Sequence, residues 1–555
     1  MIDARTIPRG TVIQSDVAVV GAGISGLSLA VEFAQAPFST CLIESGGLKP
    51  DKINQSLFWG ENVGLPYYAL ETTRARVLGG TTHFWKIKLP EAGMAARVQP
   101  MDAIDFEARD WVPYSGWPFD RNHLDPFYER AHDICGIGPY NYDPGNWADV
   151  DKPVMKFAAD DVRTSIFQFT DRSVFHNRHR ETIARAGKIK TLLNANVTHI
   201  RTDTGGRNIT GLQIDCLDGN RFTVEAKVYI LALGGIETPR LMLTCDNQCP
   251  NGIGNQHDLV GRFFMEHAHL WSGYFVPASV PVSNATGLYQ LHDNKGVPIM
   301  AKMALSEATL RREKMTNYCV SLHPDYMLSY DHYISGGRES VAAFRKLRGA
   351  FGAGKIPENA MGMLGRIIAD PVAIGRAAYR KAKGAFREKF GRAEHITVYR
   401  LNHMSEQVPN PDSRVTLSDS TDALGMRRVK LDWRLSSLDI HTITRAQEII
   451  SADMQASGLG HLEIQTRSDS LPPKIHGGWH HMGTTRMHQD PKQGVVDDTC
   501  RVHGLSNLYV AGASVFPTGG VANPVLTTIA VVLRLADHVK QTLSERDFAD
   551  MQKAG

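Results

Sequence analysis

The stretch DVAVVGAGISG, residues 16–26, decides the fold of this chain. Its first five residues form a short apolar run typical of a strand, and the residues that follow it have helical periodicity. A second apolar strand is predicted at residues 40–43. We expect Gly21 to permit a tight turn, Gly23 to let a pyrophosphate approach the backbone, and Gly26 to let helix and strand pack closely. These features predict a dinucleotide-binding βαβ unit.

The rest of the nucleotide domain favours a flavin over a nicotinamide. Glu44 ends the second strand, where its carboxylate can accept hydrogen bonds from ribose hydroxyls and argues against a 2′-phosphate. The dinucleotide phosphates are expected at the helix N-terminus, which favours anions. Residues 227–235 and 507–512 read as further strands, and residues 197–200 and 222–224 suggest a small antiparallel excursion. A domain assembled from both ends and the middle of the chain suits a large, permanently held flavin.

The last hundred residues carry the second informative block. Residues 478–487 read GWHHMGTTRM and contain two adjacent imidazoles. A buried strand and a turn are predicted over residues 507–518, and a long apolar helix is predicted to open at Asn523. Such an arrangement can place a base and a hydrogen-bonding partner on either side of one reacting atom.

These motifs resemble those of the glucose–methanol–choline (GMC) oxidoreductase family. They are the N-terminal fingerprint, RVLGGTT at 76–82, PNPDSRV at 409–415 and the block at 480–537, so the resemblance runs nearly end to end. It implies FAD as cofactor and oxidation of an alcohol hydroxyl to a carbonyl by hydride transfer to flavin N5. The implied fold class is α/β, with a Rossmann-like FAD-binding domain and a second, substrate domain built on an antiparallel sheet backed by helices.

The expected division of the chain follows from these segments. Residues 1–60, 161–265 and 466–555 are assigned to the FAD-binding domain, and residues 61–160 to a flavin loop and a lid or linker. Residues 270–465 are assigned to the substrate domain, with a basic helical insertion at 338–392. Strands of that domain are expected at 273–276, 396–401 and 414–417.

Three residues are candidates for the catalytic site, namely His480, His481 and Asn523. The resemblance places His480 at the family's catalytic histidine, where a neutral imidazole suits proton removal from a hydroxyl. In an extended segment His481 points to the opposite face, and we interpret it as structural. Asn523 is expected to hold the substrate oxygen, although Asn followed by Pro524 also fits a helix N-cap. The residues expected to bind the cofactor are Gly21, Gly23, Gly26, Glu44, Gly79, Gly80, Thr81, Val197, Gly512, Ala513, Ala522 and Pro524.

The FAD is expected to be bound without a covalent link. Some relatives attach it through a histidine directly before the tryptophan of the glycine loop. Phe84 occupies that position here, before Trp85, and His83 stands one place earlier. We expect His83 to be a polar contact near the flavin or a surface residue.

Composition narrows the function classes. The chain has 555 residues, a formal net charge of +3 and a mean hydropathy of −0.24, which is ordinary for an enzyme and gives no reason to expect a nucleic-acid partner. Its seven cysteines are scattered, and without a second close pair we expect no zinc or other metal site. A reducing, cytoplasmic location is expected, because no secretory signal and no membrane-spanning stretch are seen.

The segment 338–392 is basic and has apolar residues at helical spacing. One interpretation is a solvated basic face over a core stripe. The other is an amphipathic element that contacts an anionic membrane, such as the inner membrane, or a partner protein. It could also gate access to the flavin.

Several functions fit these residues. The block at 480–487 and the segment 514–518 look most like those of bacterial sugar and glycoside oxidoreductases of the family, so a sugar or glycoside hydroxyl is the first hypothesis. The alternative is an aromatic or aliphatic primary alcohol from a catabolic pathway. A lyase of the same family and a non-catalytic flavin subunit are two further classes. The electron acceptor stays open between oxygen, a quinone and a protein.

Overall fold

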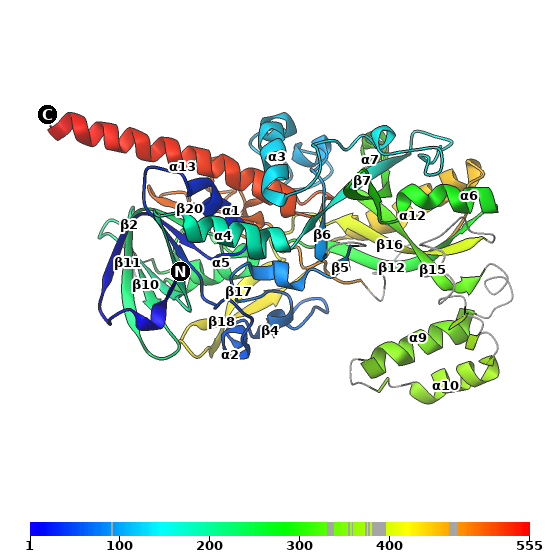
Figure 1. Cartoon of the computed structure of the whole chain (residues 1–555), viewed down its shortest axis with the longest axis horizontal. Helices are drawn as coiled ribbons and strands as arrows, with labels where there is room; N and C mark the ends of the chain where they lie inside the picture. Colours follow the sequence, from blue (N-terminus) through cyan, green and yellow to red (C-terminus); the bar gives the residue numbers. More distant parts are fainter. Residues whose placement is uncertain are drawn as a thin grey trace.

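The computed structural model consists of two large β-sheets and a small one, with helices packed on them (Figure 1). The residues that it describes are 1–89, 93–247, 249–329, 338–352, 356–357, 359–371, 374–375, 378–379, 396–464, 472 and 475–554. This mixed architecture confirms the predicted α/β fold class with a second, antiparallel sheet.

The first sheet has the strand order β1-β8-β3-β2-β11-β10-β9, and β20 pairs with β11. Six strands, β1, β8, β3, β2, β11 and β20, pair in parallel with one another. Strand β10 is antiparallel to both β9 and β11. The predicted antiparallel excursion is thereby confirmed. The strand bounds are β1 (Ile2–Asp3), β2 (Val12–Val20), β3 (Thr40–Ile43), β8 (Ile189–Leu193), β9 (Asn196–Thr202), β10 (Ile209–Asp215), β11 (Arg221–Leu231) and β20 (Leu508–Val510).

Helix α1 (Ile24–Phe33) lies on this sheet because of two glycines. Gly21 turns the chain out of β2 with a φ of +100°. A Cβ on Gly26 would lie 1.8 Å from the Gly21 carbonyl oxygen, so the first helical turn packs against the end of the strand as expected. Helix α13 (Val525–Ala554) packs beside α1 and against α3 (Arg121–Cys135), and its far end extends beyond the rest of the molecule (Figure 1).

The second sheet is antiparallel, in the order β19-β12-β16-β15-β14-β7-β6-β5, with β13 beside β14. Helix α12 (Ser437–Ala456) covers it and buries Ile443, Ala446 and Ile450 in the same core. The bounds are β5 (Ile87–Lys88), β6 (Met94–Val98), β7 (Val162–Asp171), β12 (His267–Pro277), β13 (His292–Asn294), β14 (Val297–Leu305), β15 (Tyr318–Ser329), β16 (Thr397–Glu406) and β19 (Gly460–Glu463).

The strands depart from the expected division of the chain. β5 and β6 fall in the expected lid region and β7 in the expected FAD-binding domain, but all three belong to the second sheet, in which β7 pairs with both β14 and β6, and β6 with β5. The strand expected at 414–417 in the substrate sheet forms β17 (Arg414–Thr421) of a separate three-stranded sheet with β18 (Arg427–Asp432) and β4 (Gly60–Asn62). These pairings join segments far apart in sequence, which periodicity alone does not reveal.

The other helices are short. They lie in the connections between strands (Figure 1). Their bounds are α2 (Lys52–Ser56), α4 (Arg180–Arg185), α5 (Gly234–Thr244), α6 (Val280–Ala285) and α7 (Glu307–Glu313).

Helices α9 (Arg338–Gly352) and α10 (Ala360–Ala369) form a hairpin that stands apart from the sheets (Figure 1). The predicted helical character is thus confirmed for these residues, whereas the rest of the segment up to 392 lies largely outside the described part. On α9, Val341 is fully buried. On α10 no side chain is buried, and Met361 and Ile368 are 82% and 72% exposed. A core stripe therefore exists on α9 and not on α10.

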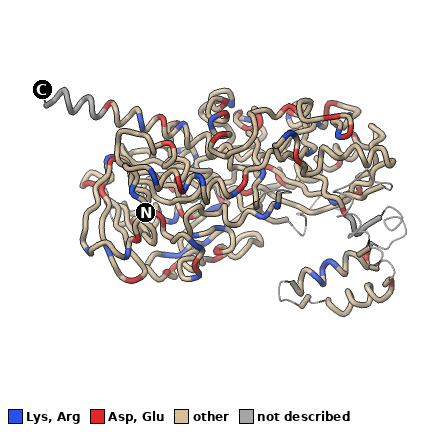
Figure 2. Tube along the Cα trace, in the orientation of Figure 1, with Lys and Arg blue, Asp and Glu red and all other residues tan. Residues whose placement is uncertain are grey.

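No helix in the described part of the chain combines the length and the apolarity that crossing a bilayer requires. Basic and acidic residues are interspersed along the trace (Figure 2).

We predict that Gly26→Ala and Gly23→Ala separate stability from ligand binding. A methyl group at residue 26 meets the Gly21 carbonyl, whereas one at residue 23 has no atom within 4 Å. Gly26→Ala should lower the free energy of unfolding of the cofactor-free protein by about 1–3 kcal/mol, as overpacking does. Gly23→Ala should leave that free energy nearly unchanged and weaken dinucleotide binding. Denaturant unfolding and flavin titration measure the two effects, and equal unfolding free energies for both variants would contradict this account.

Candidate active site

One pocket is lined by residues from the N-terminal, middle and C-terminal parts of the chain. It lies at the carboxyl ends of β2, β11 and β20 and has a cavity volume of about 390 Å³. The predicted residues that line it are Gly21, Gly23, Glu44, Gly80, Thr81, Val197, Gly512, Ala513, Pro524, His480, His481 and Asn523. Gly26, Gly79 and Ala522 are outside this lining. The structure therefore brings together most of the residues that were expected to meet at one site.

The two glycine-rich loops pack on each other at the pocket wall. The Gly79 N–H donates to the Ala22 carbonyl at 2.8 Å. A Cβ on Gly80 would lie 2.9 Å from the Gly23 Cα, so only a glycine lets the loops approach this closely. Gly23 itself faces open space, which leaves its backbone accessible to a ligand.

Glu44 is buried beneath the first glycine loop. Its carboxylate accepts the Ala22 N–H at 2.9 Å and the Gly46 N–H at 2.7 Å. The side chain thus holds the turn in place as well as lining the pocket. A carboxylate has further lone pairs, so its predicted contact with a ribose remains open to it.

His480 and Asn523 meet inside the pocket. The His480 Nε2 lies 3.1 Å from the Asn523 Nδ2, and the His480 Nδ1 lies 2.8 Å from the Nδ1 of His267. Burial, helped by the neighbouring His267 and His269, holds the pKa of His480 well below its usual value. The imidazole is therefore neutral at physiological pH, as a general base requires.

Asn523 does not cap the long helix. Helix α13 begins at Val525, two residues later than predicted. The Asn523 side-chain oxygen is buried with no hydrogen-bond partner among the described residues, while its amide nitrogen faces His480. The N-cap interpretation is therefore wrong, because the side chain turns into the pocket and away from the helix N–H groups.

His481 belongs to a separate hydrogen-bond network, although it also lines the pocket. Its Nε2 lies 3.0 Å from the Tyr67 hydroxyl, which makes a short hydrogen bond to the Glu266 carboxylate. Glu266 also accepts the backbone N–H groups of Gly478 and His480 at 3.0 and 2.9 Å. Burial raises the pKa of Glu266 to about 7 and lowers that of His481 to about 3. This network holds the backbone of the loop that carries His480.

Trp479, next to His480, has an unusual conformation. Its φ is +63°, a left-handed value that is costly for a bulky residue, and such outliers cluster at functional sites. Its ring lines the pocket, its indole N–H is buried without a partner among the described residues, and Lys86 Nζ lies 4.5 Å from the ring centre.

His83 lies away from the pocket. Its Nε2 lies 3.0 Å from the Leu78 carbonyl oxygen, and its ring stacks on His176 with centres 4.0 Å apart. Phe84 and Trp85 line the pocket in its place.

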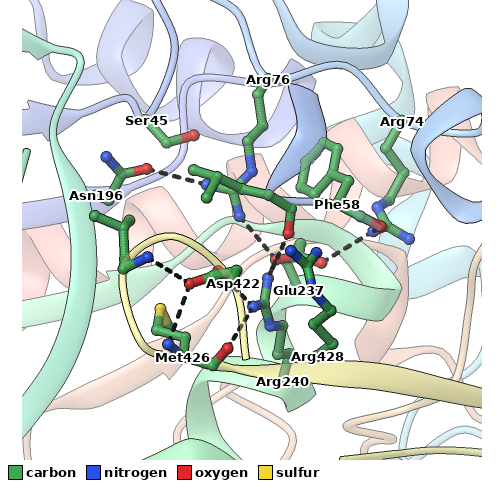
Figure 3. Close-up of polar contacts among 12 residues, drawn as sticks. Ser45, Phe58, Arg74, Arg76, Asn196, Glu237, Arg240, Asp422, Met426 and Arg428 are labelled. Carbon is green, nitrogen blue, oxygen red and sulfur yellow. Dashed lines mark hydrogen bonds and ion pairs between the residues drawn. The ribbon is translucent and has the colours of Figure 1, made fainter. Parts of the chain in front are cut away.

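A buried cluster of arginines forms another part of the wall (Figure 3). The Glu237 carboxylate forms ion pairs with Arg74, Arg76 and Arg240, with N–O distances of 3.0, 2.9 and 3.1 Å. Asp422 forms an ion pair with Arg240 at 2.7 Å. Three positive charges thus face two negative ones. Burial lowers the pKa of Arg74 to about 10, which leaves it charged at neutral pH.

The free donors of this cluster point to a ligand. Arg74 and Arg76 both stack on Phe58, with their guanidinium carbons 4.3 and 4.4 Å from the ring centre. Buried N–H groups of both arginines have no partner among the described residues. Together with the open backbone at Gly23, the wall fits an anionic dinucleotide such as FAD.

Sequence reasoning missed the residues that support this site. They are Tyr67, Arg74, Arg97, Glu237, Arg240, Glu266, His267, Asp422 and Trp479. Two of them, Glu266 and His267, could have been noticed, because they are an acid and a histidine inside the apolar run FFMEHAHL at 263–270. Polar residues embedded in a buried strand need partners.

Comparison with known families matches two regions of the chain that contain residues of this site. Two models described as GMC oxidoreductase match residues 171–269 and 409–531. Together they include Glu266, His267, His480 and Asn523.

Relatives of known activity share sequence with the chain. It is 24% identical to 2-methyl-1,2-propanediol dehydrogenase from Mycolicibacterium austroafricanum, over 96% of each chain. It is 27% identical to the fructose dehydrogenase large subunit of Gluconobacter japonicus, over 64% of this chain and 55% of that one. A C-glycoside 3-oxidase from Microbacterium trichothecenolyticum is 34% identical over 24% of this chain and 25% of its own length.

Solved structures share the fold. A variant of formate oxidase from Aspergillus oryzae RIB40 matches with a TM-score of 0.53 and 17% identity, over 97% of this chain and all of that one. An FAD-dependent oxidoreductase from Chaetomium thermophilum matches with a TM-score of 0.52 and 17% identity, over 96% of this chain and all of that one.

Proposed function

We propose that this chain, which belongs to the GMC oxidoreductase family, is an FAD-dependent enzyme that oxidises a hydroxyl group of a sugar or glycoside. Oxidation of an alcohol with FAD follows from the family. The observation that carries the assignment to this site is the pairing of His480 Nε2 with the Asn523 amide in the pocket, at 3.1 Å.

His480 and Asn523 have different roles toward the substrate hydroxyl. A hydroxyl placed between them donates its hydrogen bond to His480 Nε2 and accepts one from the Asn523 amide. As the proton moves to Nε2, the amide N–H stabilises the negative charge that develops on the oxygen. Bound FAD supplies the acceptor, at N5, for the hydride that leaves the carbon. Gly23, Gly80 and Arg74 are the groups placed to hold the cofactor.

The wall beside His480 supports a polar substrate. It includes Trp479, Lys86 and Arg97, an aromatic face with two cationic side chains. Two of the relatives named above act, by their names, on fructose and on C-glycosides. The alternative, a smaller aliphatic or aromatic alcohol, is supported by the propanediol dehydrogenase and by a 5-(hydroxymethyl)furfural oxidase from Methylovorus that is 40% identical over 12% of the chain.

The experiment is anaerobic reduction of the bound flavin by a panel of sugars, glycosides and simple alcohols, and variants are then compared on the fastest substrate. His480→Ala should lower the rate constant of flavin reduction by about 100-fold to 10,000-fold and leave FAD bound, because it removes the base. His481→Ala should lower it less, because its imidazole is bonded to Tyr67. Loss of activity in the His481 variant alone would reverse the assignment, and reduction by simple alcohols only would favour the alternative substrate.

The pH profile of kcat/KM tests the state of the base. Because the folded pKa of His480 lies well below its ordinary value, the imidazole stays unprotonated as the pH falls through about 6.5, where an unperturbed histidine gains its proton. Protonation of His480 should therefore give no inflection there and an acid limb only at clearly lower pH. Burial raises the pKa of Glu266 to about 7, so the profile is also measured in Glu266→Gln, and an acid limb centred near 6.5 in that variant would contradict this environment for His480.

We propose that the FAD is held without a covalent bond. The support is that Phe84 lines the pocket while His83 stacks on His176 and bonds to Leu78. Acid precipitation of the yellow holoenzyme should release all the flavin into the supernatant. Colour that stays in the washed pellet would show a covalent link.

We propose further that the α9–α10 hairpin contacts an anionic membrane surface. Met361, Leu364 and Ile368 are exposed at helical spacing on α10, and such apolar patches mark interaction sites. Lys346 and Arg348 supply exposed positive charge on α9, whereas Arg376, Arg380, Lys381 and Lys383 lie outside the described residues. This charge favours anionic lipid over an apolar protein partner.

Liposome co-sedimentation tests the hairpin. The wild-type protein should bind vesicles that contain anionic lipid and dissociate at high salt, because exposed charges are screened within about 10 Å at 0.1 M. The double variant Met361→Ser, Ile368→Ser should lose binding. Ile53→Ser is the matched control, since Ile53 is 66% exposed on α2. Wild-type protein that stays in the supernatant would leave a partner protein or a solvated surface as the explanation.

A further inference from the structure

His267 opens strand β12 and is fully buried beside the proposed base. Its two ring nitrogens make different contacts. The Nδ1 lies 2.8 Å from the Nδ1 of His480, and the Nε2 lies 2.9 Å from the carbonyl oxygen of Gly520. The residue thus links the second sheet to both the catalytic loop and the segment before Asn523.

The proton positions follow from these contacts. A carbonyl oxygen only accepts, so the His267 Nε2 must carry a hydrogen and donate it to Gly520. Burial lowers the pKa of His267 to about 4, so the ring is neutral and its Nδ1 has a lone pair. The 2.8 Å contact then requires the Nδ1 of His480 to be the donor. Since His480 is also neutral, its Nε2 has the lone pair.

We propose that His267 is a positioning residue that fixes the reactive tautomer of His480. By accepting the hydrogen on His480 Nδ1, it leaves the Nε2 lone pair directed at Asn523 and at the substrate hydroxyl. This inference rests on the proposed function, in which His480 Nε2 takes the hydroxyl proton.

The hydrogen bond from His480 Nδ1 to His267 is also kept when His480 becomes positively charged. When the substrate O–H bond breaks and the proton binds Nε2, His480 becomes an imidazolium whose Nδ1–H still donates to His267. The surrounding charges oppose that state: His267 itself, His269, His481 and Arg97 all disfavour a positive charge on His480, so the help that His267 gives is the hydrogen bond that it accepts. Glu266 contacts the His480 backbone N–H and does not reach the ring nitrogens through any hydrogen bond found among the described residues.

Three substitutions at residue 267 distinguish tautomer control from simple anchoring. An asparagine places its side-chain oxygen where Nδ1 lies and so keeps an acceptor for His480. A glutamine extends its amide toward the Nε2 position, so it can keep the bond to Gly520 but offers no acceptor at Nδ1. A leucine removes both bonds. If His267 only anchored Gly520, the glutamine variant would be the more active of the two amides.

We expect His267→Gln and His267→Leu to lower the limiting rate constant of flavin reduction by about 100-fold, the lower end of general-base effects. The dissociation constant of the substrate should change less than about threefold, as expected when only transition-state stabilisation is lost. His267→Asn should keep the rate constant within about tenfold of wild type. FAD content and thermal unfolding of each variant show whether the fold is intact.

Several outcomes would overturn the inference. They are a glutamine variant as active as the asparagine variant, a leucine variant as active as wild type, or an asparagine variant as slow as leucine. Loss of FAD in all three variants alike would show a structural role instead. If no alcohol reduces the wild-type flavin, or if His480→Ala is fully active, it is the proposed function that fails.

A measurement without turnover tests the tautomer directly. In protein labelled with ¹⁵N in its histidine rings, solid-state NMR distinguishes protonated from bare ring nitrogens, and the signals absent in His480→Gln identify His480. We expect His480 to be protonated at Nδ1 and bare at Nε2 in wild type and in His267→Asn, and mixed in His267→Leu. Protonation at Nε2 in wild type would overturn the inference.

Discussion

Parallel pairing of three strands from distant parts of the chain is the constraint on which the site depends. β2, β11 and β20 end side by side, because Leu231 pairs with Val20 on one side and Val510 on the other. The chain segments that leave these three strands all enter the pocket. Ligands of open parallel sheets bind at such carboxyl ends. The glycine fingerprint, the α5 helix and the segment from Ala511 to Asn523 are neighbours for this reason, and the loop that carries His480 reaches the same place by hydrogen bonds such as that from the Gly483 N–H to the Ala513 carbonyl.

The pocket handles buried polarity in two distinct ways. At the end bordered by Glu237, charge is kept and nearly balanced, with three guanidinium groups around two carboxylates. At the end bordered by His480, burial leaves the imidazoles neutral, and hydrogen bonds between neutral rings fix their orientation. Charged walls suit an anionic ligand that stays bound, whereas neutral imidazoles suit a step in which one proton must move.

Local rules predicted the parts of this structure that depend on near neighbours in sequence. The turn at Gly21, the packing of Gly26 and the strand at 40–43 all follow from steric limits within about 25 residues, which are visible in the pattern. The membership of β7 in the second sheet could not be predicted, because its partner β14 lies some 130 residues further on and the alternation of side chains fits either sheet. Asn523 was ambiguous for a similar reason: the Asn-Pro pair satisfies the local rules for a cap, and only the distant His480 decides where the side chain turns. His267 gave no signal beyond its unusual place in an apolar strand.

The closure of the first sheet by β20 has a consequence for how the protein is made. During synthesis the fingerprint leaves the ribosome early, yet the wall formed by Gly512, Ala513 and Pro524 emerges only after several hundred further residues. Until then the apolar edge of β11 beyond its pairing with β10 has no permanent neighbour. Nascent chains should therefore depend on chaperones late in translation, and fragments released early should be unable to retain the cofactor.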